Sequence, residues 1–160
     1  GLAIAKRAAL GFDMSVRYHN RSRRDDVPYG YCDSPLALAR ESDFLVIATP
    51  GGANTRALVD SAVLDALGAE GFLVNIARAS VVSTADLIAA LREGRIAGAA
   101  LDVFDDEPNV PDELKALENV VLTPHVAGQS PEAARDTVAL VLKNLQAFFA
   151  GEPVLTPVTA

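Results

Sequence analysis

A chain of 160 residues that is 50% apolar and carries a net charge of −7 suits one globular domain with a buried core. The negative charge argues against nucleic acid or an anionic membrane as the main partner. The sequence has no apolar run of the about 18 residues that a membrane span needs. The single cysteine, Cys32, cannot form an internal disulfide, and no Cys/His cluster has metal-site spacing. We therefore expect a cytoplasmic protein without a bound metal.

Helices and strands are predicted to alternate along the chain. The helices are predicted from an apolar face, a polar residue that can cap the start, or a glycine at the end. They span residues 2–10, 35–41, 56–67, 84–92 and 131–150. A short acidic helix is also predicted before the last strand. The predicted strands are short and mostly apolar, and they span residues 14–18, 44–48, 72–75, 98–103 and 120–122. This alternation indicates right-handed βαβ units and an α/β fold, a Rossmann-type doubly wound parallel sheet in a three-layer αβα arrangement.

Gly1 opens the first predicted helix, and the strand after that helix ends in a basic cluster. A dinucleotide-binding fold has this pattern from its third glycine onward, since a strand and two glycines come before. We therefore interpret residues 1–150 as a nicotinamide dinucleotide-binding domain that is truncated at its N-terminus and lacks its first strand. Gly1 and Leu2 are then cofactor-binding residues. An ordinary helix start is the alternative explanation for Gly1.

The basic cluster, YHNRSRR at residues 18–24, lies where such a fold contacts the adenosine ribose. An NAD-specific site places Asp or Glu there, roughly 20 residues after the glycines, to bond the ribose 2′-hydroxyl. This chain has Asn20 instead, followed by Arg21, Ser22 and Arg23, whose donors suit phosphate oxygens. We predict that these four residues bind the 2′-phosphate of NADPH, with NADH also possible. A solvated basic loop is the alternative.

Chemically active side chains also follow three later strands: Arg78, then Asp102 and Glu107, then His125. An arginine at a strand end can hold a substrate carboxylate and carbonyl through paired hydrogen bonds. A histidine beside a carboxylate forms an acid/base pair, because the carboxylate favours the protonated imidazole and orients it. Each residue alone has a structural explanation. Together they predict an active site, because ligands bind beyond the carboxyl ends of parallel strands.

The segments NIARASVV, GAALDVFDDEP and VVLTPHVAG occur in this order, and they resemble the D-isomer-specific 2-hydroxyacid dehydrogenases over essentially the whole chain. The resemblance implies that Arg78 binds the substrate's carboxylate and carbonyl, that His125 protonates the carbonyl, and that Glu107 pairs with His125. Asp102 is then the residue that faces the nicotinamide carboxamide. The cofactor contacts implied beyond those above are Thr49, Pro50, Thr55, Asn75, Ile76, Ala77, Arg78, His125 and Gly128. Residues 151–160 (GEPVLTPV and the two residues after it) resemble the start of the segment that returns to the substrate domain, and we expect that domain to lie outside this chain.

Within that family, the loop YHNRSRR and the stretch ATPGG resemble the NADPH-using glyoxylate and hydroxypyruvate reductases. The resemblance implies reduction of a short 2-oxo acid to the D-2-hydroxy acid by hydride transfer from NADPH, in a homodimer formed through the cofactor domain. Ala79 departs from the glycine that usually follows the catalytic arginine. The alternatives are an NAD-linked relative such as a phosphoglycerate or formate dehydrogenase, a non-catalytic corepressor-like module that senses NAD(H), and a truncated product without function.

Overall fold

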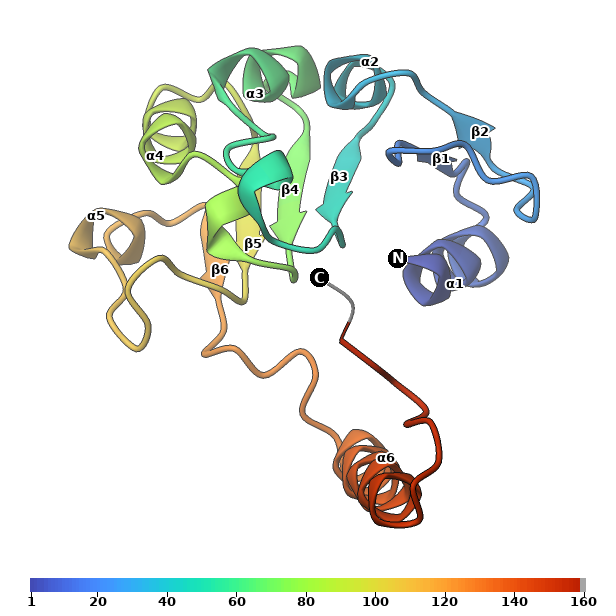
Figure 1. Cartoon of the computed structure of the whole chain (residues 1–160). Helices are drawn as coiled ribbons and strands as arrows, with labels where there is room; N and C mark the ends of the chain where they lie inside the picture. The colour runs from blue at the N-terminus through green and yellow to red at the C-terminus, as the bar shows by residue number, and fades with distance from the viewer. Residues whose placement is uncertain (159–160) are drawn as a thin grey trace. The chain divides into compact units, whose positions relative to one another are not determined.

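The computed structural model describes residues 1–158 and divides into two compact units, one from Gly1 to His125 and one from Val126 onward (Figure 1). The first unit contains every strand and five of the six α-helices described. The second unit contains one long helix and the segment that follows it. None of the described helices is both long and apolar enough to cross a membrane.

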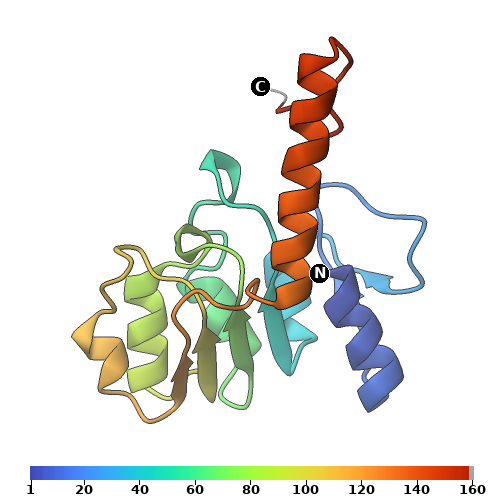
Figure 2. The ribbon, with the colours of Figure 1, turned by 90° about the horizontal axis from the view of Figure 1, so that it is seen from below.

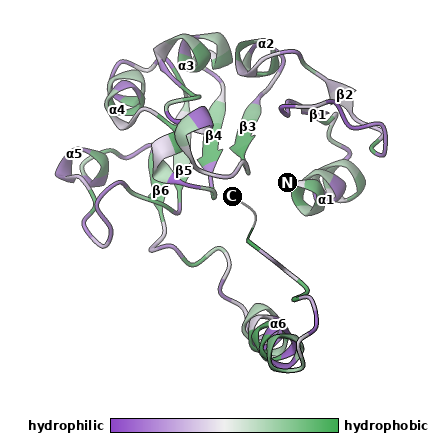
Figure 3. Ribbon diagram, in the orientation of Figure 1, coloured by the Kyte–Doolittle hydropathy of each residue, from purple (hydrophilic) through white to green (hydrophobic). Residues whose placement is uncertain are grey.

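The main sheet of the first unit is parallel and has the strand order β3-β4-β5-β6, in which neighbours pair side by side (Figures 1 and 2). Its strands are β3 (Phe44–Ile47), β4 (Phe72–Asn75), β5 (Gly98–Leu101) and β6 (Val120–Leu122). Figure 3 shows β3 and β4 in the hydrophobic colour. This confirms the predicted Rossmann-type parallel sheet.

A second parallel sheet contains only β1 (Arg17–Tyr18) and β2 (Gly30–Tyr31), which pair Tyr18 with Tyr31. No strand among the described residues joins β1 to β3, so the sheet is interrupted there. In the general doubly wound fold the strand order is 3-2-1-4-5-6, so the fold's first strand lies between the strands that correspond to β1 and β3 of this chain. That the first strand of the fold is missing at this position stays a prediction.

Most of the α-helices begin after a Ser or Asp residue whose side chain caps the first turn. The α-helices are α1 (Leu2–Phe12), α2 (Pro35–Arg40), α3 (Ser61–Leu67), α4 (Thr84–Arg92), α5 (Asp112–Lys115) and α6 (Pro131–Phe149), and the 3₁₀ turns are η1 (Ala53–Thr55) and η2 (Ala79–Val81). A side-chain oxygen accepts a hydrogen bond from the N–H three residues later at the caps of four of them, Ser34, Asp60, Ser83 and Ser130. Helices α2, α3 and α4 pack in a row beside the main sheet, and the buried core of the first unit lies between them and the strands.

Some boundaries differ from those predicted. Helix α1 continues through Gly11 to Phe12, and its C-cap, Asp13, adopts a left-handed φ of 54°. Asp tolerates this conformation better than most residues, so the glycine is not needed to end the helix. Strand β1 is shorter than predicted, and β2 was not predicted. Residues 56–60 of the helix predicted over 56–67 are not α-helical, because Ala57 has a φ of 48°.

Candidate active site

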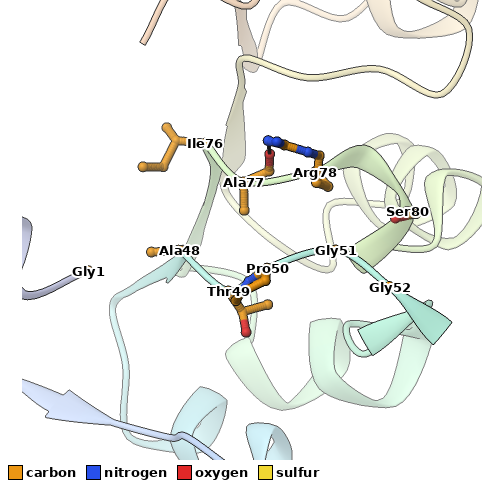
Figure 4. Close-up of a pocket in the computed structure, with 10 residues that line it drawn as sticks. All are labelled: Gly1, Ala48, Thr49, Pro50, Gly51, Gly52, Ile76, Ala77, Arg78 and Ser80. Atoms are coloured by element: carbon orange, nitrogen blue, oxygen red, sulfur yellow. Dashed lines mark hydrogen bonds between the residues drawn. The ribbon is translucent and has the colours of Figure 1, made fainter. Parts of the chain in front are cut away.

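The carboxyl ends of β3 and β4 border a pocket of about 690 Å³ (Figure 4). Its lining residues come from the start of α1 and from the loops after the two strands: Gly1, Ala48, Thr49, Pro50, Gly51, Gly52, Ile76, Ala77, Arg78 and Ser80. The pocket therefore brings together many of the predicted cofactor residues from distant parts of the chain. Thr55 is not among the lining residues, and its hydroxyl donates to the carbonyl of Pro50 at 2.8 Å.

Asn75, at the end of β4, holds the turn that carries the predicted catalytic arginine. Its side chain is buried at 2% exposure and does not line the pocket. Its Oδ1 accepts from the N–H of Ala77 and its Nδ2 donates to the carbonyl of Arg78, both at 3.0 Å. A buried amide needs such partners. Sequence reasoning assigned Asn75 to the pocket wall and missed this supporting role, although a polar residue ending a buried strand is the available signal.

Arg78 lies against the backbone of Gly51, which comes from the loop after the neighbouring strand (Figure 4). A Cβ atom on Gly51 would lie 2.8 Å from the Cγ of Arg78 and 3.2 Å from its Cβ. The Nη1 of Arg78 donates to the carbonyl of Ala77 at 2.6 Å. The absence of a side chain at Gly51 therefore leaves the space that the arginine occupies.

Glu107 and His125 form the hydrogen bond predicted for an acid/base pair. The distance from His125 Nδ1 to Glu107 Oε2 is 2.8 Å, and the other carboxylate oxygen accepts from the N–H of Phe104 at 2.9 Å. The hydrogen bond from His125 lowers the pKa of Glu107 most, the Phe104 N–H lowers it further, and the charges of His125 and Arg78 act in the same direction. The carboxylate is therefore stabilised in its charged form, and Arg78 is near enough to contribute.

His125 adopts a left-handed backbone conformation, with φ 54°. Non-glycine residues rarely occupy this region, and such strain concentrates at functional sites. The backbone N–H of His125 donates to the carbonyl of Thr123 at 3.0 Å, which closes a tight turn after β6. The turn is the local structure that sets the imidazole beside Glu107.

Asp102 follows β5 and is buried at 4% exposure, where its Oδ1 accepts from the hydroxyl of Thr123 at 2.5 Å. The bond links the ends of β5 and β6, immediately before the turn of His125. Asp102 does not line the pocket of Figure 4. Sequence reasoning did not identify Thr123 as its partner, because the two residues are far apart in the chain.

The arginines of the basic loop after β1 differ in whether they form an ion pair. Arg24 pairs with Asp26, with 2.9 Å between Nε and Oδ1, and the pair raises the pKa of Arg24. Arg21, Ser22 and Arg23 are exposed, and neither of these two arginines forms an ion pair with any residue that the structure describes. The guanidinium groups of Arg21 and Arg23 therefore carry positive charge that no carboxylate of the described residues neutralises.

Two predicted cofactor contacts, Leu2 and Gly128, are not among the residues that line the pocket. Leu2 is in the first turn of α1 and is 38% exposed. Gly128 is an exposed residue of the second unit.

A parallel sheet with a pocket at its carboxyl edge, a glycine at the start of α1 and a basic loop after the next strand defines the dinucleotide-binding class of α/β domains. The chain belongs to the D-isomer specific 2-hydroxyacid dehydrogenases, because residues 1–127 match the model of that family's NAD binding domain.

Several relatives are similar along nearly the whole chain. Glyoxylate/hydroxypyruvate reductase A of Arabidopsis thaliana is 50% identical over 158 residues, which are 99% of this chain and 50% of that protein. The NADPH-dependent glyoxylate/hydroxypyruvate reductase of Sinorhizobium meliloti, solved in complex with NADP and malonate, has a TM-score of 0.94 at 43% identity, over 99% of this chain and 50% of that one. The holo D-mandelate dehydrogenase of Rhodotorula graminis has a TM-score of 0.93 at 34% identity, over 98% of this chain and 47% of that one. The chain therefore spans about half the length of the relatives it matches.

Proposed function

We propose that the protein to which this chain belongs reduces a short 2-oxo acid, of the glyoxylate or hydroxypyruvate type, to the D-2-hydroxy acid with NADPH. The observation that carries the proposal is the hydrogen-bonded pair of Glu107 and His125, with Arg78 close enough to act on the same carboxylate. Its similarity to glyoxylate/hydroxypyruvate reductases supports the substrate class.

The residues present fit a nicotinamide dinucleotide. Gly1, which has no side chain, is the N-cap of α1 and lines the pocket, and the N-terminus of a helix offers backbone N–H groups to phosphate. Ile76 and Ala77 form an apolar part of the pocket wall, which suits the nicotinamide ring. Arg21 and Arg23, which have no ion-pair partner among the described residues, offer positive charge to a 2′-phosphate, and Asn20 replaces the carboxylate that would repel it. When bound, the nicotinamide supplies the hydride.

The chain's own residues then bind the substrate and handle the proton. The guanidinium of Arg78 pairs with the substrate carboxylate through parallel hydrogen bonds and orients the adjacent carbonyl. Glu107 accepts from Nδ1 of His125 and favours the protonated imidazole, which donates its other ring proton, at Nε2, to the carbonyl oxygen. A module that only senses the reduced cofactor would have no need of this proton donor.

The test measures turnover of glyoxylate and hydroxypyruvate with NADPH and with NADH, for the enzyme that carries this chain and for its variants Arg21→Ala and Arg23→Ala. We expect a preference for NADPH, and each variant should weaken NADPH binding about ten- to a hundredfold because it loses one charge-assisted contact. The binding of NADH should change little in either variant. A preference for NADH would overturn the cofactor assignment, and absence of turnover would favour the sensor.

We also propose a cytoplasmic homodimer formed through the cofactor domain. Helix α6 supports association, because seven of its apolar side chains are at least 40% exposed: Val138, Leu140, Val141, Leu142, Leu145, Phe148 and Phe149. An apolar surface of this kind is typical of one that a second protein copy covers.

A further inference from the structure

The loop after β1 is held at both ends by tyrosine hydroxyl groups. The hydroxyl of Tyr18 accepts from the backbone N–H of Arg24 at 2.8 Å and donates to the carbonyl of the same residue at 3.0 Å. The hydroxyl of Tyr31 donates to the carbonyl of Asn20 at 3.3 Å. The segment between these two points contains Arg21, Ser22 and Arg23.

The two tyrosines support one another through the small sheet. Tyr18 in β1 and Tyr31 in β2 are paired in register, and their rings meet edge to face with centroids 5.4 Å apart. His19 stacks on Tyr31 at 6.1 Å, and its Nδ1 lies 2.9 Å from the carbonyl oxygen of Cys32. The rings anchor the hydroxyl groups, and the hydroxyl groups in turn restrain the backbone of the loop.

We propose that Tyr18 is a positioning residue that selects NADPH over NADH without contacting the cofactor. This inference rests on the proposed NADPH function. Tyr18 closes the loop from residue 18 to residue 24, and Arg24 is held further by Asp26, so Arg21 and Arg23 project from a backbone that is ordered before the phosphate binds. A loop ordered in advance loses less conformational entropy on binding, and only the contact to the 2′-phosphate gains from this order.

The test compares Tyr18→Phe with the matched control Tyr29→Phe. The first variant keeps the ring and removes two hydrogen bonds, whereas the hydroxyl of Tyr29 makes no hydrogen bond within the described residues. For Tyr18→Phe we expect the KM for NADPH to rise about five- to thirtyfold, with kcat at saturating NADPH unchanged. The KM for NADH should stay within about twofold in both variants.

A second measurement isolates the phosphate. Adenosine 2′,5′-bisphosphate and adenosine 5′-monophosphate are used as inhibitors competitive with the cofactor. Tyr18→Phe should weaken the binding of the bisphosphate and leave the binding of the monophosphate unchanged. Tyr31→Phe should act in the same direction by about two- to fivefold, since it removes one longer hydrogen bond. Thermal unfolding of each variant reports whether the small sheet is intact.

The outcomes separate this inference from the proposed function. If Arg21→Ala and Arg23→Ala leave NADPH binding unchanged, the phosphate site itself is wrong. If those variants weaken NADPH binding while Tyr18→Phe does not, only the positioning role is overturned. If Tyr18→Phe raises the KM for both cofactors equally, the residue is structural and the inference is also overturned.

Discussion

Gly51 and Arg78 are single residues on different loops whose contact leaves no room for a methyl group. In Gly51→Ala the new Cβ would lie 2.8 Å from the Cγ of Arg78, in the stem of that side chain, so the arginine must move. We expect a loss of about tenfold or more in kcat/KM for the 2-oxo acid, since small displacements of a positioning group are costly. Steady-state kinetics of Gly51→Ala and of Gly11→Ala test this. An alanine at residue 11 meets nothing within 4 Å and should leave activity unchanged.

Glu107 is the residue whose protonation most directly reports on the acid/base pair. Its pKa lies below the ordinary value of 4.5, chiefly because of the hydrogen bond from His125. A carboxyl with a lowered folded pKa stabilises the native state above its ordinary pKa, and this contribution is lost as the pH falls through the lower folded value. The pairing should therefore persist at pH 4.5 and break only in stronger acid.

An NMR titration of the Glu107 carboxyl carbon measures this directly. We expect a midpoint below 4.5 in the wild-type protein and a rise toward the ordinary value in His125→Ala, because the largest cause of the shift is then removed. An unchanged midpoint in that variant would show that the Phe104 N–H and the charge of Arg78 dominate instead.

At the scale of elements, α3 depends on its cap because it has only seven residues. The Oδ1 of Asp60 accepts from the N–H of Val63 at 3.1 Å and satisfies one donor of the first turn. Asp60→Ala should lower the free energy of unfolding by about 1 kcal/mol, whereas Asp60→Asn, which also caps well, should be nearly neutral. Urea denaturation measures both. Equal stability of the wild type and the alanine variant would contradict the role of the cap.

At the scale of the whole molecule, the exposed apolar side chains of α6 predict association. Light scattering at low protein concentration should give twice the monomer mass, and Leu145→Glu should shift the mass toward the monomer, because it places a charge in an apolar interface. Lys143→Glu on the same helix is the matched control and should leave the dimer intact. A wild-type protein that is only monomeric would rule out the proposed dimer.

The sequence alone was sufficient for the parallel sheet of β3–β6, for α4 and α6, and for the pair of Glu107 and His125. Helices and strands of this kind are encoded by hydrophobic periodicity and capping residues within a few positions of one another. The pair was accessible because the motifs that contain its members resemble those of a known family. The distance of 2.8 Å between His125 Nδ1 and Glu107 Oε2 could not be read from the sequence, because it depends on how two loops meet.

Tertiary structure alone decided the features that join distant segments. Strand β2 has only two residues and exists because Gly30 and Tyr31 pair with β1, so no local pattern predicts it. The hydrogen bond between Thr123 and Asp102 and the contact of Gly51 with Arg78 likewise join segments that are far apart in the chain. Local propensity and periodicity determine where elements form. The partner of each polar side chain is set by packing between elements, because hydrogen bonds require a geometry that sequence spacing does not specify.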